Sequence, residues 1–428
     1  MNKIVDKTKY RPRIMDDKVQ KSLSTFGAIC IEGPKWCGKT WISSYHANSE
    51  FLLMDPKDNF QNRRLAEMSP DIILDGKTPR LIDEWQEVDA IWDAVRYMID
   101  SNGKKGQFIL TRSSTPKLLN RLHSGAGRIG RLRMHTMSLY ESNDSSGILS
   151  LFDLCNGNVT PTLVKGANLF DLAYFIIRGG FPGALNLPLD NIKIIMDSYI
   201  ESILKDDTKK IDGKRYDIHK MRLLLRSLAR NESTTATMKK LTRDIEDIDN
   251  SSLDYDSVMT YLDILERLYL LDNQKPFSLN IRSSLRVKQA EKRHFCDPSI
   301  PSYLLDLTPS KLINDLNTFG FLFETLCERD LRIYAESFGG QLYHYQDYAN
   351  NEIDAVIELK DGRWCAFEIK LGANQVDNAA SNLIKIRDKI ASVGGKIPSI
   401  MCVICGLGNA IYQRKDGIYV VPITSLKN

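Results

Sequence analysis

The sequence of 428 residues predicts an α/β fold in three parts. A mainly parallel sheet with helices on both faces comes first, then a helical region, then a second and smaller α/β part. Two observations carry this prediction. The chain is longer than a single hydrophobic core usually spans, and short apolar runs alternate with helical stretches in its first part. The boundaries that we predict are residues 1–160, 161–310 and 311–428.

The composition is that of an ordinary globular protein, with 43% hydrophobic and 26% charged residues. A net charge of +4 permits a polyanionic partner without requiring one. Neither the N-terminus nor any later stretch is apolar enough for a signal peptide or a membrane span, so we expect a cytoplasmic protein that does not engage a membrane. The eight cysteines are scattered through apolar runs, which indicates reduced thiols. Cys402 and Cys405 have metal-site spacing, but without a second pair we expect core packing.

Short apolar runs predict the strands of the first sheet, and amphipathic stretches between them predict its helices. The predicted strands are residues 28–31, 51–55, 79–84 and 106–111. The predicted helices are residues 16–25, 40–46 and 85–101.

A phosphate-binding loop follows the first predicted strand. Its residues are Gly33, Pro34, Lys35, Trp36, Cys37, Gly38, Lys39 and Thr40, which fit the pattern of Gly, four residues, then Gly-Lys-Ser/Thr. Glycines let backbone N–H groups point at phosphate oxygens, Lys39 adds a cation for the β- and γ-phosphates, and Thr40 is a ligand for Mg²⁺. The helix that starts here favours anions at its N-terminus. We therefore expect ATP or GTP binding.

The third predicted strand ends in two carboxylates, Asp83 and Glu84. In a phosphate-loop ATPase such a pair holds Mg²⁺ through the first residue and polarises the attacking water through the second. The alternative is an acidic loop at a strand end. Thr111 or Ser113, at the end of the fourth predicted strand, lies where open α/β sheets bind ligands and is a candidate sensor of the γ-phosphate.

Residues 124–133 form a glycine-rich segment that contains Arg128 and Arg131. Glycine gives mobility and the arginine fork suits phosphate, so this segment is a candidate arginine finger, in cis or toward a neighbouring subunit of a homo-oligomer. A flexible loop with solvated arginines is the equal alternative.

Four segments together resemble an AAA-type ATPase family of bacteria and archaea that carries a C-terminal domain of unknown function. They are the phosphate loop, residues 81–86, residues 110–115, and residues 127–131 with 137–141. The resemblance implies a P-loop NTPase domain with Lys39 and Thr40 on phosphate and Mg²⁺ and with Asp83 and Glu84 as the Walker B pair. It also implies Ser113 or Ser114 near the sensor position, and Arg128 and Arg131 in the arginine loop.

One residue departs from that resemblance. The family usually has glycine at the position of Arg112. The departure implies a bulky cation beside the γ-phosphate sensor, which puts efficient hydrolysis in question.

The middle region predicts two sets of helices. Residues 170–178 and 192–204 resemble the helical lid of such an ATPase, and residues 219–229, 238–245 and 257–268 form three further helices. A basic stretch follows, and with a strand pair there the three helices would make a winged helix that contacts DNA. Its phosphate contacts would be Arg282, Arg286, Lys288, Lys292 and Arg293. The alternative is a protein–protein spacer.

The C-terminal part carries a second set of candidate catalytic residues. Asp354 lies in the predicted strand 351–358, while Glu368 and Lys370 face the same side of the strand 364–370. If the strands pair as a hairpin these side chains converge, and two carboxylates with a lysine suit a Mg²⁺-dependent phosphodiester cut. The pattern resembles the restriction-endonuclease-like fold. The alternative is a descendant that only binds or assembles, and Glu324, in a predicted helix 319–331, either joins the metal or caps the site.

These observations predict an ATPase that uses ATP and Mg²⁺ and couples hydrolysis to DNA engagement, with a metal-dependent nuclease as a second activity. The alternative is a nucleotide-switched binding or signalling protein whose nuclease-like domain docks on a partner protein.

Overall fold

The computed structural model describes residues 5–116, 124–249, 253–278 and 290–428. The chain forms two compact units. Unit 1 consists of residues Met1–Thr136, Glu201–Tyr216 and Leu262–Leu270, and unit 2 consists of Met137–Ile200, Asp217–Tyr261 and Leu271–Asn428. Each unit is described by itself.

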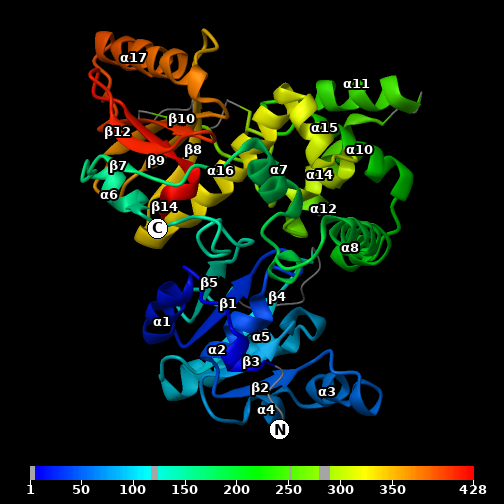
Figure 1. Cartoon of the computed structure of the whole chain (residues 1–428). Coiled ribbons are helices and arrows are strands. Elements are labelled where there is room, and N and C mark those ends of the chain that lie inside the picture. Colours follow the sequence, from blue (N-terminus) through cyan, green and yellow to red (C-terminus); the bar gives the residue numbers. More distant parts are fainter. Residues whose placement is uncertain (1–4, 117–123, 250–252, 279–289) are drawn as a thin grey trace. The chain divides into compact units, whose positions relative to one another are not determined.

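Unit 1 contains a five-stranded sheet in the order β2-β3-β4-β1-β5, and all of its pairings are parallel. The strands are β1 (Ala28–Glu32), β2 (Ser49–Leu52), β3 (Arg80–Asp83), β4 (Phe108–Arg112) and β5 (Ile129–Arg133). The helices are α1 (Asp16–Thr25), α2 (Lys39–His46), α3 (Lys57–Met68), α4 (Pro70–Leu74) and α5 (Ala90–Asn102). The predicted mainly parallel sheet with intervening helices is confirmed (Figure 1).

Two hydrophobic clusters lie on opposite faces of this sheet. Cys30 and Leu110 pack with Trp92 of α5 on one face, whereas Ile31 and Ile109 pack with Ile42 of α2 on the other. Successive strand residues point to opposite faces. At the ends of β1 and β4, alternate side chains therefore point to opposite faces of the sheet. We call the face covered by α2, which carries the phosphate loop, the α2 face, and the face covered by α5 the α5 face.

Half of the glycine-rich segment 124–133 is a β-strand. The sequence analysis did not predict this strand. Residues 129–133 form β5, which pairs in parallel with β1 from Ala28 and Ile129 onward. Ile129 and Leu132 are buried while Arg131 is exposed. Edge strands tolerate exposed charge, so the mixed composition suits the edge of a sheet.

Two later segments of the chain complete unit 1. One contains a π-helical turn (Ile203–Asp207) and α9 (Thr208–Asp212), which follow α8 (Leu189–Ser202). The other is the end of α12 (Tyr255–Arg267) with the residues up to Leu270. The backbone N–H of Thr115, just after β4, donates to the carbonyl of Arg267.

Unit 2 contains α7 (Leu169–Arg178), α10 (Ile218–Arg230), α11 (Met238–Asp249), α14 (Ser299–Leu304) and α15 (Pro309–Asn314). The first three correspond to predicted helices of the middle region, as do α8 and α12, which continue into unit 1, whereas α14 and α15 were not predicted. After α12, isolated antiparallel bridges join Leu271 to Phe295 and Gln274 to Lys292. These bridges are compatible with the predicted strand pair, but Arg282, Arg286 and Lys288 lie outside the described residues. The winged helix stays a prediction.

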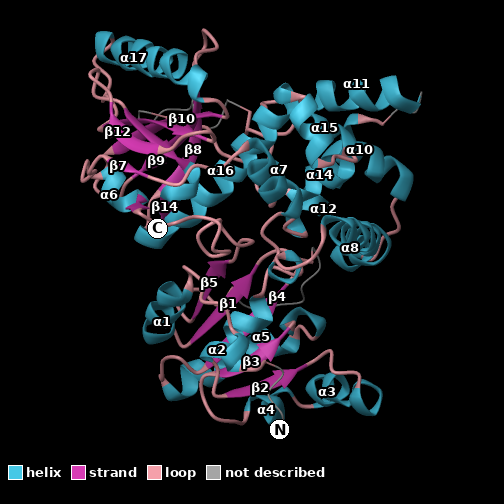
Figure 2. Cartoon of the chain, in the orientation of Figure 1, coloured by secondary structure: helices cyan, strands magenta, loops and turns pink. Residues whose placement is uncertain are grey.

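Unit 2 also contains a mixed sheet (Figure 2). It has seven strands in the order β7-β12-β13-β11-β10-β9-β8. Its strands are β7 (Thr162–Leu163), β8 (Gln341–Gln346), β9 (Glu352–Glu358), β10 (Trp364–Lys370), β11 (Ile400–Cys405), β12 (Ala410–Gln413) and β13 (Tyr419–Pro422). Strands β9 and β10 pair antiparallel, as the predicted hairpin requires. The helices α16 (Leu316–Phe338) and α17 (Val376–Ser392) both pack on this sheet.

Smaller elements tie the chain after Thr136 to the C-terminus. Strand β6 (Leu149–Ser150) pairs with β14 (Leu426–Lys427), α6 (Leu151–Cys155) follows β6, and Asp330 of α16 accepts a hydrogen bond from the Leu139 N–H at 2.9 Å. The first segment of unit 1 thus ends at Thr136, before the predicted boundary at residue 160. The three-part division stays a prediction.

Among the described residues, no helix is both long and apolar enough to cross a membrane. All eight cysteines are buried and free. Cys402 and Cys405 lie in β11 with fully or almost fully buried side chains.

Candidate functional site

The phosphate loop runs from β1 into α2 with backbone conformations that suit a tight turn. Gly38 is the N-cap of α2 with a φ of 104°, and Trp36 also has a positive φ, at 66°. A Cβ atom on Gly33 would lie 2.2 Å from the carbonyl oxygen of Met134, so glycine is required there by close backbone packing. Left-handed conformations at non-glycine residues concentrate at functional sites. The loop is built as the motif predicts.

Lys39 turns its ammonium group back into this loop. Its Nζ donates to the carbonyls of Gly33 at 3.1 Å and Pro34 at 2.8 Å, and the residue is only 5% exposed. A buried cation at the N-terminus of a helix is suited to bind phosphate oxygens. The structure therefore places Lys39 within the phosphate loop, and its contact with phosphate stays a prediction.

Thr40 and Asp83 meet beside the loop. The Thr40 hydroxyl donates to Oδ1 of Asp83 at 3.0 Å, and the Thr111 hydroxyl donates to the same oxygen at 2.7 Å. A hydroxyl and a carboxylate are oxygen ligands of the kind that Mg²⁺ prefers. These two residues fit the predicted magnesium site.

Burial is the main cause that raises the pKa of Asp83 to about 6, and the neighbouring carboxylate of Glu84 adds to it. The hydroxyls of Thr111 and Thr40 and the charge of Lys39 act in the opposite direction. A buried carboxylate with this excess of negative charge nearby favours a bound cation.

Glu84 is fixed by β4. Its backbone has a φ of 55° and its N–H donates to the Thr111 hydroxyl at 2.9 Å. Ser113 donates its hydroxyl hydrogen to Oε2 of Glu84 at 2.8 Å. Thr111 thus holds Asp83 and the Glu84 backbone, while Ser113 holds the Glu84 carboxylate. Of the two predicted sensor candidates, Thr111 contacts both members of the acidic pair and Ser113 contacts Glu84.

Arg112 lies on the other face of the sheet from Thr111. Its Nε donates to Glu32 Oε2 at 2.6 Å, and the Tyr269 hydroxyl donates to the same oxygen at 3.1 Å. Arg112 is 3% exposed and continues the α5 face on which Leu110 lies. The implied position beside the γ-phosphate sensor is therefore wrong, because strand alternation turns the guanidinium away from Thr111.

The two loop arginines both contact α5. Arg128 pairs with Asp100 at 2.8 Å, and the Arg131 guanidinium lies 5.6 Å from the ring centroid of Trp92. These contacts place both side chains on the α5 side of the sheet. Their role as arginine fingers stays a prediction.

Arg13 and Asp207, which the sequence analysis did not single out, both contact the phosphate loop. The buried Arg13 donates to the carbonyls of Cys37 and His135, each at 2.9 Å. Lys35 pairs with Asp207 of the π-helical turn at 2.6 Å, and Asp207 is 3% exposed. Both contacts join residues far apart in sequence, and no local pattern marks them.

In unit 2 the structure brings together the three predicted residues of the C-terminal set. Lys370 Nζ lies 2.9 Å from Asp354 Oδ2 and 2.7 Å from Glu368 Oε2. Asp354 also accepts from the Ile369 N–H at 2.8 Å, and Glu368 accepts from Asn382 of α17 at 2.8 Å. One lysine thus bridges both carboxylates.

A second lysine reaches the same region, and it corrects a prediction. Lys292 is 6% exposed, with its Nζ in contact with Glu324 Oε1 and 3.8 Å from Glu328 Oε1. The predicted place of Lys292 on DNA phosphates is therefore wrong, because its ammonium is buried among carboxylates of its own chain. Glu324 pairs with this lysine.

Burial dominates the ionisation of these groups. It raises the pKa of Glu324, Glu328 and Glu368 to about 8 each, although Lys292 opposes it at Glu324 and Glu328, and Lys370 opposes it at Glu368. At Lys292 burial lowers the pKa, but Glu324, Glu328 and Asp354 outweigh it, so the pKa is raised. At Lys370 burial likewise lowers the pKa, but Asp354 and Glu368 outweigh it, so both ammonium groups stay charged.

The two sites differ in whether their side chains can hold a metal ion. Thr40 and Asp83 offer oxygens to a cation next to the phosphate loop. Asp354 and Glu368 already share the ammonium of Lys370, and Lys292 lies among the neighbouring carboxylates. Within the described ranges, no group of three or more His, Cys, Asp or Glu side chains converges to hold a metal ion. The C-terminal residues therefore do not fit the predicted Mg²⁺ as they stand.

Three segments of the chain match known families. Residues 25–143 match the AAA domain, residues 169–311 match a domain of unknown function (DUF8612), and residues 319–426 match another (DUF4143). With the parallel sheet and the phosphate loop, the first match identifies the N-terminal part as an AAA-type P-loop domain and supports ATP binding. The other two descriptions name no activity.

No curated protein matches the chain. Among solved structures, the Walker-type ATPase of Pyrococcus abyssi aligns with 70% of this chain and 100% of its own, at 12% identity and a TM-score of 0.45. A variant of RuvB from Thermotoga maritima aligns with 62% of this chain and 93% of its own, at 14% identity and a TM-score of 0.29. Both scores are low, so the fold assignment rests on the strand order and the loop.

Proposed function

We propose that the N-terminal domain binds ATP with Mg²⁺ and hydrolyses it. The observation that carries this proposal is the contact between Thr40 and Asp83, 3.0 Å apart beside a phosphate loop, with Glu84 next in the chain. The AAA match over residues 25–143 supports the same class of activity.

Each side chain then has a separate task. Lys39 would move from the loop carbonyls to the β- and γ-phosphates, and Thr40 and Asp83 would hold Mg²⁺, which would supply positive charge for the phosphate oxygens. Glu84 orients the attacking water and accepts its proton, while Ser113 fixes the Glu84 carboxylate. Because Thr111 bonds both acidic residues, it keeps the cation site and the water site at a constant separation.

The test is to compare ATP binding and turnover in three purified proteins. Lys39→Ala should abolish binding, whereas Glu84→Gln should bind ATP normally but turn it over about 10²–10⁴ times more slowly, as expected for loss of a general base. Equal turnover in wild type and Lys39→Ala would show that the loop assignment is wrong. Normal turnover in Glu84→Gln would remove only the role of Glu84.

For the middle region we propose DNA engagement, coupled to the ATPase. Two pairs of basic residues support it: Arg226 and Arg230 on α10, and Lys239 and Arg243 on α11, all exposed. Each pair is spaced i, i+4, so its members lie on one helix face. Helices α10 and α11 pack together, and exposed basic faces of this kind suit phosphate backbones.

Salt-dependent DNA binding tests this proposal. Replacing the four residues by glutamine should weaken binding and lower the slope of log affinity against log salt by about one for each lost phosphate contact. Lys415→Gln, at an exposed lysine between β12 and β13, is the control. An unchanged slope would contradict DNA contact by these helices. If DNA also leaves ATP turnover slow and unstimulated, the nucleotide-switched alternative is favoured.

For the C-terminal domain we propose the non-catalytic role, a module that binds or assembles with a partner protein. The observation that favours it is that the ammonium groups of two lysines already contact its acidic side chains. Incubation of wild type and Asp354→Asn with single- and double-stranded DNA and Mn²⁺ decides between the roles. Cleavage that depends on Asp354 would establish the nuclease instead.

A further inference from the structure

A groove in unit 2 lies between α8, α10 and the end of α14 (Figure 1). Its volume is about 660 Å³, and its walls include Ile194 of α8, Arg222 and Arg226 of α10, and Tyr303 and Leu304 of α14. We call it the α8–α10 groove. Pockets of roughly 300–1,000 Å³ hold drug-sized ligands, and a nucleotide is a ligand of that size.

Three arginines of α10 lead into the α8–α10 groove. Arg222, Arg226 and Arg230 follow one another at intervals of four residues, so they lie along one face of the helix. Arg226 and Arg230 are the exposed pair proposed above as phosphate contacts, and Arg222 and Arg226 line the groove. The basic face of α10 therefore continues into the groove, and Arg226 belongs to both.

Arg226 is the cation of the groove that a ligand can use. Two of the three carboxylates that line the groove have partners within the chain, because Asp306 pairs with Lys193 and Asp197 accepts a hydrogen bond from the Tyr303 hydroxyl. Among the described residues, Arg226 has no ion-pair or hydrogen-bond partner. Its guanidinium is therefore free to bind a phosphate that reaches the groove.

Tyr303 gives the groove an aromatic wall. Its ring is half-buried, and the bond from its hydroxyl to Asp197 fixes the orientation of the ring. Burial is the main cause that raises the pKa of Tyr303 to about 12, so the side chain is uncharged at neutral pH. Ile194, which is 70% exposed, adds apolar surface. Aromatic rings beside a basic track are the surfaces on which unpaired nucleobases stack.

We propose that the α8–α10 groove binds an unpaired nucleobase, so that the middle region engages single-stranded DNA. Arg226 holds the phosphate beside that base, and the ring of Tyr303 stacks on the base. The proposal rests on the DNA engagement proposed above and adds to it the form of DNA that is bound.

A duplex cannot make this contact without being opened. Its bases are paired and stacked inside the helix, and moving one of them into a protein pocket costs unstacking and unpairing energy. The basic faces of α10 and α11 contact phosphates, which both forms of DNA carry. The groove therefore adds an interaction that only the single strand makes. Because every base has a π face, the preference should tolerate different sequences.

The test measures how tightly the full chain binds a single-stranded oligonucleotide of mixed sequence and a blunt duplex, each at several salt concentrations. Tyr303→Leu should weaken binding of the single strand about 5- to 100-fold, as expected for one lost base stack, and should leave duplex binding unchanged. Its slope of log affinity against log salt should stay that of wild type, because no phosphate contact is lost. Tyr303→Phe keeps the ring and should bind the single strand nearly as wild type does.

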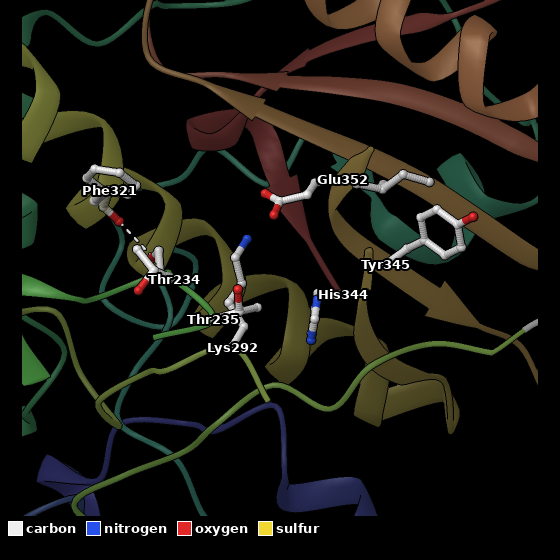
Figure 3. Close-up of a pocket in the computed structure, with 9 residues that line it drawn as sticks. Thr234, Thr235, Lys292, Phe321, His344, Tyr345 and Glu352 are labelled. Atoms are coloured by element: carbon white, nitrogen blue, oxygen red, sulfur yellow. Dashed lines mark hydrogen bonds between the residues drawn. The ribbon is translucent and has the colours of Figure 1, made fainter. Parts of the chain in front are cut away.

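Tyr345→Leu is the matched control. It removes the same kind of ring from a separate cavity of unit 2, with a volume of about 190 Å³, that Tyr345 lines together with Lys292 and His344 (Figure 3). This variant should bind both forms of DNA as wild type does.

A second variant covers a folding failure of Tyr303→Leu. Ile194→Glu changes a side chain that is 70% exposed, so the fold should tolerate it, and it places a carboxylate where the strand would lie. It should weaken binding of the single strand more than binding of the duplex. Val393→Glu, at an apolar side chain that is 79% exposed after α17, should change neither.

Four results would overturn the proposal alone. They are wild-type binding of the single strand by Tyr303→Leu and Ile194→Glu, an equal loss on both forms of DNA, a loss in Tyr345→Leu as large as in Tyr303→Leu, and a loss of that size in Tyr303→Phe. If wild type binds neither form, DNA engagement by the middle region is itself wrong and this inference falls with it. Duplex binding that depends on the four basic residues of α10 and α11 would separate the two cases.

Discussion

Glu328 illustrates how the interior of unit 2 controls a single ionisable side chain. Burial raises its pKa from 4.5 to about 8. The groups around it are Lys292 and Arg332, which lower the pKa, Asp354, which raises it, and the contacts of Gln274 and His294. The folded protein therefore binds a proton at Glu328 more tightly than the unfolded chain does.

The sign of the resulting pH dependence follows from this difference. Between pH 4.5 and 8 the folded state holds a proton that the unfolded state has lost, so the contribution of Glu328 to stability falls as pH rises. Glu328→Gln cannot ionise. Its unfolding midpoint relative to wild type should increase from pH 5 to pH 8 and then level off, as measured by thermal unfolding in matched buffers.

Glu352→Gln, at an exposed glutamate of β9, is the control for that series. A constant difference between Glu328→Gln and wild type across the pH range would contradict the raised pKa.

The part of the site that could be predicted from the sequence consists of side chains that belong to a motif or lie close together in the chain. Lys39, Thr40, Asp83 and Glu84 follow from the loop pattern and from an apolar strand that ends in two acids. Lys292 was assigned wrongly because a basic run reads as a solvated surface, and its buried partners come from α16. The pairing of Lys35 with Asp207 spans 172 positions, beyond the reach of any local pattern.

At the scale of elements, hydrophobic periodicity predicted the strands β1 to β4 and the helices α1, α2 and α5 of unit 1 to within about five residues, but α3 and α4 were not predicted. It missed β5 because glycine and arginine hide the alternation of an edge strand. Periodicity also could not show which face of the sheet each strand-end side chain joins. The face that each side chain joins depends on where α2 and α5 pack. Thr111 lies on the α2 face, whereas Arg112 lies on the other face, where it bonds Glu32.

The turn from β1 into α2 depends on the absence of a side chain at Gly33. A Cβ there would meet the Met134 carbonyl at 2.2 Å, and backbone cannot move aside as a flexible side chain can. Gly33→Ala should destabilise the protein by about 1–3 kcal/mol, the usual cost of overpacking, and weaken ATP binding. Thermal unfolding and nucleotide titration measure both effects.

Gly320→Ala is the matched control, because a Cβ at this position of α16 meets no atom within 4 Å. It should stabilise the protein by about 0.5–1 kcal/mol through helix propensity. Equal stability of the two alanine variants would contradict the packing argument for Gly33.

At the scale of the whole molecule, the chain passes between its two units repeatedly. The changes fall at residues 136/137, 200/201, 216/217, 261/262 and 270/271. Unit 1 therefore includes Asp207, which pairs with Lys35, and Tyr269, which bonds Glu32 just before the loop. A sequence pattern reveals consecutive elements, so it cannot show that a compact unit recruits later segments.

A fragment of residues 1–160 should therefore be an incomplete nucleotide-binding unit. It lacks Asp207 and Tyr269, and we expect ATP affinity at least about tenfold below that of the full chain, or about 1.4 kcal/mol. Isothermal titration with ATP and Mg²⁺ measures the difference. In the full chain, Asp207→Asn with Tyr269→Phe should reproduce part of the loss, and equal affinity of fragment and full chain would contradict this prediction.

Arg13 has a practical consequence for any shortened or tagged version of this protein. Its guanidinium holds the Cys37 carbonyl from 24 positions upstream and, through His135, the chain just after β5. A version that begins at α1 would keep every motif residue and yet release the loop from this clamp. If such a version binds nucleotide weakly, the cause would be the loss of Arg13, because the residues of the phosphate-loop motif would all be present.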